Sequence, residues 1–134
     1  MRRLICLIAL TSIPAIAAEP CGPTLGGAST RAESEHYSVV FRTVPARVAV
    51  GRAFALEAQV CAKGAAPPPT GLRVDARMPA HRHGMNYRPT VVAEGEGRFR
   101  AEGLLFHMPG QWQFIFDLEV PGANERITKD LSLE

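Results

Sequence analysis

The sequence predicts an antiparallel β-sandwich, and three observations carry that prediction. Apolar and polar residues alternate in several short stretches, which is the period of a half-buried strand. Proline and glycine, with 11 and 12 copies, separate those stretches at short intervals. No stretch shows the helical period of about 3.6 residues. About seven short strands in about 100 residues favour two packed sheets, with a small open barrel as the alternative.

The clearest predicted strand is residues 111–120. Its inward-facing residues are all apolar: Trp112, Phe114, Phe116, Leu118 and Val120. Residues 54–61 and 72–78 alternate in the same way, and Pro79 ends the second because proline cannot donate to a β-ladder. The remaining predicted segments are residues 36–41, an extended edge at 47–51, residues 89–94, residues 98–103 with the apolar run 104–106, and a last strand through Ile127, Leu131 and Leu133.

The first 18 residues have the layout of a cleavable signal peptide. Arg2 and Arg3 form a positive start, an apolar run follows, and small residues precede the cleavage point. That run is shorter than the roughly 20 residues that span a bilayer, and a retained anchor is the alternative. We therefore divide the chain into a signal peptide (1–18), a flexible N-terminal arm (19–35) and a β-sandwich domain (36–134). We expect a periplasmic protein whose mature chain has no stable membrane span.

Cys21 and Cys61 are predicted to form a disulfide. They are the cysteines that remain when Cys6 is removed with the signal peptide, and an even pair in an exported chain is typical of a disulfide. The bond would close a loop of about 40 residues and add about 3–4 kcal/mol on the chain-entropy estimate. The alternative is that both thiolates bind metal, although they lie far along the chain from the other candidate ligands.

The charge of the chain gives no reason to expect a nucleic-acid partner. The formal net charge of +2 falls to near zero once Arg2 and Arg3 leave with the signal peptide. The remaining basic residues are scattered and form no stripe with interleaved aromatic residues.

Two short turns gather most of the soft and borderline metal ligands. The first is Met78–Met85 (Met-Pro-Ala-His-Arg-His-Gly-Met) and the second is Phe106–Gly110 (Phe-His-Met-Pro-Gly). In an extended backbone, residues two apart point the same way, so His81 and His83 would present both imidazoles on one face. The candidate metal ligands are His81, His83, Met85, His107 and Met108.

Copper is the metal that these donors favour. Imidazole suits copper and zinc, and thioether is soft and selects Cu(I). Neither turn contains the Asp or Glu that hard cations require, and Cys61, which a blue-copper site would need, is better used in the disulfide. Without metal, the histidines would bond to backbone or face solvent, Met78 would end an inward-facing series, and Met108 would pack beneath a turn.

Catalysis is not predicted. The chain shows no Ser or Cys nucleophile beside a suitable base, no Gly-rich phosphate loop, no paired-carboxylate spacing and no His-Glu-x-x-His helix. His83 or His107 could act as a general base in principle, but the sequence shows no partner to orient either one.

The order of three motifs resembles the YtkA-like family and the related FixH-like proteins, which are small exported or membrane-anchored bacterial domains. The motifs are Met78–Met85, residues 97–103 (Gly-Arg-Phe-Arg-Ala-Glu-Gly) and residues 106–112 (Phe-His-Met-Pro-Gly-Gln-Trp). The resemblance implies an immunoglobulin-like β-sandwich without catalytic activity, linked in some relatives to copper handling or respiratory oxidase assembly. A cleavable signal departs from the anchored relatives and puts in doubt any role that needs permanent membrane attachment.

Two functions follow from these observations. The first is a periplasmic domain that binds copper through a His/Met site, for copper delivery or respiratory-enzyme assembly. The second is a metal-free protein–protein interaction module of the cell envelope, in which the two turns dock a partner and Phe106 and Trp112 are packing residues. Convergence of the two turns would favour the first function, and turns at opposite ends of the sandwich would exclude a single shared site.

Overall fold

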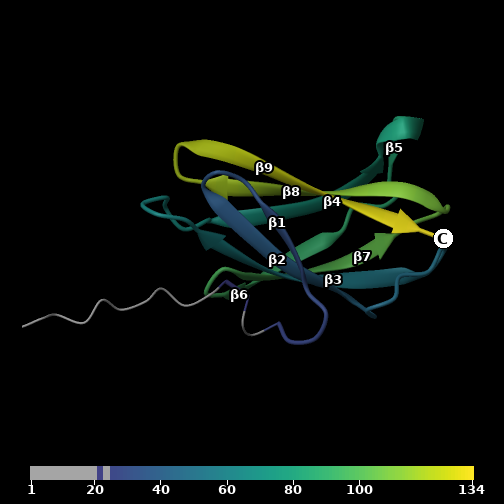
Figure 1. The fold of residues 1–134 in the computed structure, drawn as a ribbon, viewed down its shortest axis with the longest axis horizontal. Helices are drawn as coiled ribbons and strands as arrows, with labels where there is room; N and C mark the ends of the chain where they lie inside the picture. The colour runs from purple at the N-terminus through teal and green to yellow at the C-terminus, as the bar shows by residue number, and fades with distance from the viewer. Residues whose placement is uncertain (1–20, 23–24) are drawn as a thin grey trace, which may run out of the picture.

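The protein is a sandwich of two antiparallel sheets (Figure 1). A computed structural model describes residues 21–22 and 25–134. The first sheet has the order β1 (Thr30–Glu33), β2 (Tyr37–Val44), β3 (Ala53–Ala62), β7 (Arg98–Leu105) and β6 (Thr90–Gly95). The second sheet has the order β5 (His83–Gly84), β4 (Gly71–Met78), β8 (Gly110–Val120) and β9 (Ala123–Leu133). The predicted antiparallel sandwich is confirmed, with nine strands in the described residues instead of about seven.

Several strand boundaries differ from the prediction. β1 lies inside the stretch expected to be a flexible arm, and its four residues pair with residues 38–41 of β2. β5 is only two residues long and pairs with the end of β4. Strands this short leave no alternating pattern in a sequence. The extended edge predicted at 47–51 is wrong, because this stretch is a connection that turns at Val50 and Gly51. The predicted signal peptide lies outside the described residues.

Helical structure in the described part of the chain is limited to one 3-10 turn, η1 (Pro79–His81). No helix there is long and apolar enough to cross a bilayer. η1 follows β4 directly and begins the segment that carries three of the candidate ligands, His81, His83 and Met85.

The core lies between the inner faces of the two sheets. The alternating residues of β4 and β8 are buried as the sequence predicts: Leu72, Val74, Ala76, Met78, Trp112, Phe114, Phe116 and Leu118. Phe41 of β2 crosses the sandwich to Phe114 and Phe116, with ring centroids 5.4 and 4.9 Å apart. Met78 and Trp112 are each 1% exposed. Both therefore belong to the core.

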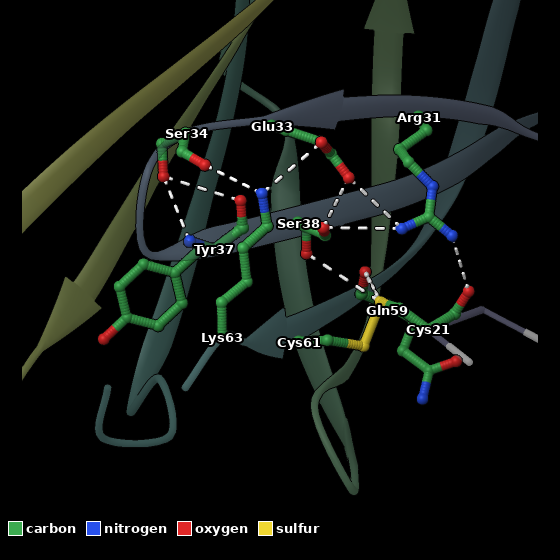
Figure 2. A network of polar contacts seen from close by, with 9 residues as sticks. All are labelled: Cys21, Arg31, Glu33, Ser34, Tyr37, Ser38, Gln59, Cys61 and Lys63. Atoms are coloured by element: carbon green, nitrogen blue, oxygen red, sulfur yellow. Dashed lines mark hydrogen bonds and ion pairs between the residues drawn. A yellow bond between two sulfur atoms is a disulfide. The ribbon is translucent and has the colours of Figure 1, made fainter. Parts of the chain in front are cut away.

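The predicted disulfide between Cys21 and Cys61 is present and closes a sequence separation of 40 residues (Figure 2). It holds the arm against the first sheet, where Gly22 lies so close to Val40 that a Cβ on the glycine would be 2.6 Å from that side chain. The Arg31 guanidinium donates to the carbonyl of Cys21 at 3.2 Å. The disulfide therefore joins the arm to β3 next to two further contacts of the arm, the packing of Gly22 on Val40 and the hydrogen bond from Arg31 to Cys21.

A polar network surrounds the disulfide (Figure 2). The Ser38 hydroxyl donates to the Glu33 carboxylate at 2.9 Å, and the Lys63 ammonium lies 3.4 Å from the same carboxylate. The Ser38 hydrogen bond and then the Lys63 interactions hold the pKa of Glu33 below its ordinary value. Lys63 also donates to the carbonyl of Ser34 at 2.9 Å, which ties the end of β3 to the β1–β2 connection.

Removal of the disulfide tests how much of the domain depends on this attachment. We expect Cys21→Ser/Cys61→Ser to lower the free energy of unfolding by about 3–4 kcal/mol, because the unfolded chain loses its cross-link. Urea unfolding of the oxidised wild type and the double variant measures the difference. A variant as stable as the oxidised wild type would contradict the expectation.

Candidate metal centre

The first turn with candidate metal ligands folds back onto the strand that precedes it. Pro79 begins η1, and Arg82 closes this turn in the left-handed conformation with φ of 54°, its backbone N–H pointing to the Pro79 carbonyl at 3.4 Å. The chain then enters β5, where His83 pairs with Met78 of β4. Directly opposite residues of an antiparallel pair project from the same face. His83 therefore lies on the inner face with Met78.

The two histidines of this turn come together by a different route from the one predicted. An extended His81-Arg82-His83 segment was expected to align both imidazoles, but this segment is not extended because Arg82 is left-handed. The ring centroids of His81 and His83 nonetheless lie 5.7 Å apart. His81 is exposed and His83 is half-buried, so the pair runs from solvent toward the core.

The second turn connects β7 in one sheet to β8 in the other. Phe106 is fully buried, and its ring stacks on Trp112 with centroids 4.4 Å apart and an interplanar angle of 18°. The indole N–H of Trp112 donates to the Met108 carbonyl at 3.0 Å. The Phe106 carbonyl accepts the backbone N–H of Gly51 at 2.8 Å. These contacts fix the turn at the end of the sandwich.

The two turns meet beside Trp112. The ring centroids of His83 and His107 lie 5.1 Å apart. The Trp112 ring centroid lies 6.1 Å from that of His83 and 5.5 Å from that of His107. Met85 and Met108 are both half-buried and pack against the hydrophobic core. The structure therefore brings together the three histidines predicted from the two turns. One methionine of each turn packs against the core.

His107 carries a polar atom that has no protein partner. Its Nδ1 is buried and makes no hydrogen bond. Buried nitrogen atoms are nearly always paired, since an unpaired one costs about 1–3 kcal/mol. On His83, Nδ1 lies 3.2 Å from the Gly84 carbonyl, which leaves Nε2 as the nitrogen available to a ligand. The donor set therefore fits a soft or borderline metal ion.

One observation bears on whether these side chains could form a metal site as they stand. No group of three or more His, Cys, Asp or Glu side chains within the described ranges is arranged to hold a metal ion. The ring contacts link His81 to His83 and His83 to His107 as two pairs. A complete coordination shell would thus need a side-chain adjustment or a thioether ligand.

Sequence reasoning assigned Phe106 and Trp112 to packing and did not foresee that they join the two turns. The signal available in the sequence was their spacing, which puts one aromatic residue on each side of His107-Met108-Pro109-Gly110. The sequence could not reveal that Nδ1 of His107 is buried without a hydrogen-bond partner, because this depends on which atoms surround the ring.

The fold and the cluster define a small β-sandwich domain with a His/Met group against a buried tryptophan at one end. The profile of the YtkA-like family matches residues 31–117, and the chain belongs to that family. A solved DUF4426 family protein from Pseudomonas aeruginosa PAO1 is similar at 10% identity and a TM-score of 0.48, over 79% of this chain and 96% of that one. No curated protein matches the chain.

Replacement of Trp112 tests whether its indole fixes the second turn. Trp112→Phe keeps an aromatic ring next to Phe106 but removes the donor to the Met108 carbonyl. We expect the free energy of unfolding to fall by about 1–3 kcal/mol, and the amide resonances of residues 107–109 to shift.

Gln111→Ala is the matched control, because Gln111 is exposed and bonds only to Ser132. Its effect should stay within about 0.5 kcal/mol. If Trp112→Phe changes stability no more than this control and leaves residues 107–109 unmoved, the indole does not hold the turn.

Proposed function

We propose that this protein is an exported, non-catalytic domain that binds copper at His83 and His107. The observation that carries the proposal is the buried, unpartnered Nδ1 of His107, on a ring whose centroid is 5.1 Å from that of His83. A metal ion lies about 2 Å from each imidazole nitrogen that binds it. Two rings at this separation can therefore share one ion after small side-chain rotations.

The side chains around the pair favour copper over other metals. His81 adjoins His83, and the half-buried thioethers of Met85 and Met108 come from the same two turns. Thioether is a ligand for Cu(I), whereas calcium and magnesium take oxygen ligands. The turns supply no carboxylate, and both cysteines of the described chain are joined to each other. These features support copper as the cargo of the site.

Export is the setting in which this site would act. A disulfide between Cys21 and Cys61 is compatible with an oxidising compartment such as the periplasm. The proposed role is to carry copper to an envelope protein, for copper delivery or for the assembly of a respiratory enzyme. The domain would hold and release the ion without changing it chemically.

Copper titration of the mature, oxidised protein tests this function. We expect uptake of about one equivalent, since one pair of half-buried imidazoles is available. We also expect quenching of the fluorescence of Trp112, which is the single tryptophan. Copper at 100 times its dissociation constant should stabilise the fold by about 2.7 kcal/mol. His83→Ala/His107→Ala and His81→Ala/His83→Ala should lose the uptake.

His36→Ala is the control, because His36 is exposed and pairs with Glu125 on β9, away from both turns. It should bind copper as the wild type does. Unchanged binding by His83→Ala/His107→Ala would overturn the proposed site.

A metal-free interaction module is the second candidate function. It is favoured by the finding that no group of three His, Cys, Asp or Glu side chains in the described residues is arranged for a metal. Absence of copper uptake at micromolar concentration would decide in its favour.

A further inference from the structure

Three connections at the histidine-bearing end of the sandwich are rich in arginine and contain no acidic residue. They are residues 45–52, 79–89 and 106–109, which we call the arginine end. Four exposed arginines lie in the first two connections: Arg47, Arg52, Arg82 and Arg88. The cationic character is therefore concentrated at one end of a chain whose overall charge is nearly balanced.

Two contacts join the three connections into one surface. The backbone N–H of Gly51 donates to the Phe106 carbonyl at 2.8 Å, and the rings of His83 and His107 lie 5.1 Å apart. Figure 1 shows this end at the right, where β7 and β9 finish and β5 lies. Glu134, the last residue, reaches the same end after β9. The arginines thus lie in connections at the same end of the sandwich as the histidine cluster.

The arginines of this surface lack acidic partners within the molecule. In the part of the chain that the structure describes, none of the four forms an ion pair with a carboxylate. By contrast, Arg42 on β2 and Arg100 on β7 both lie 2.7 Å from Glu57. The positive charge at the arginine end is therefore available to a second molecule.

Exposed apolar side chains lie on the same surface. Tyr87 is 62% exposed and Val50 is 37% exposed, and together with Val92 they are the large hydrophobic residues exposed in the described chain. Tyrosine and arginine are enriched at the centres of protein–protein interfaces. The three connections therefore combine exposed arginine with exposed apolar side chains and contain no carboxylate side chain of their own.

We propose that the arginine end, which includes His81, His83 and His107, docks an acidic face of a partner protein. Arginine pairs with carboxylates in a bidentate geometry, so four unpaired arginines fit a partner face rich in Asp and Glu. A membrane face would instead need several apolar anchors beside its basic residues. That this partner exchanges copper rests on the proposed function, whereas the docking does not.

A defined acidic probe tests the docking without metal. The copper-free, oxidised protein is titrated with a short synthetic poly-glutamate peptide, and amide resonances are followed at low and high salt. We expect shifts in residues 45–52, 79–89 and 106–109, and loss of binding as salt screens the charges. Arg52→Glu/Arg88→Glu should weaken binding about tenfold, because each attraction becomes a repulsion.

The matched control is Arg73→Glu/Lys129→Glu, which makes the same charge change at exposed strand positions outside the arginine end. Equal weakening by both double variants, or shifts outside the three connections, would overturn the proposal. Vesicles of phosphatidylcholine and phosphatidylglycerol that bind the same residues more tightly than the peptide would also overturn it, in favour of a membrane face. Because no copper is present, failure of the copper site leaves this result unaffected.

Discussion

Contacts of Trp112 hold together the end of the sandwich on which the candidate site depends. The indole stacks on Phe106 at 4.4 Å and donates to the Met108 carbonyl at 3.0 Å. The stack joins the end of β7 to β8 in the other sheet, and the hydrogen bond fixes the turn that bears His107. Because β5 places His83 on the same inner face, the same indole borders both imidazoles. One buried side chain thus brings two distant turns together.

Patterns that repeat along the chain were predictable, and contacts between distant segments were not. The alternation of apolar and polar residues in β4 and β8 correctly predicted which side chains are buried, including Met78 and Trp112. This works because successive residues of a strand point to opposite faces of the sheet. The strands β1 and β5 were missed since four and two residues carry too little pattern. The sequence singled out the two turns as candidate metal-binding segments, which remains a prediction. The buried, unpaired nitrogen of His107 arises only from tertiary packing and could not be predicted.

The arginines at the same end as the histidine cluster could in principle serve either to retain a metal ion or to bind a partner. If the histidine cluster binds copper as proposed, unpaired arginines at the same end raise the free energy of the bound cation, so they would not serve to retain it. They are suited to meeting acidic groups of another molecule, which would also offset their repulsion of the metal. On that proposal, the arginine end would lower the affinity of the cluster for copper until a partner neutralises its charge. Such an arrangement would suit delivery of an ion better than its storage.

Ring nitrogen resonances of the histidines during Cu(I) titration test the central claim most directly. In protein labelled with nitrogen-15, the account predicts that His83 and His107 shift together and stop shifting at about one equivalent, because both bind the same ion. His36, which pairs with Glu125, should not move. Shifts of the two rings at different copper ratios, or of neither ring, would contradict a shared site.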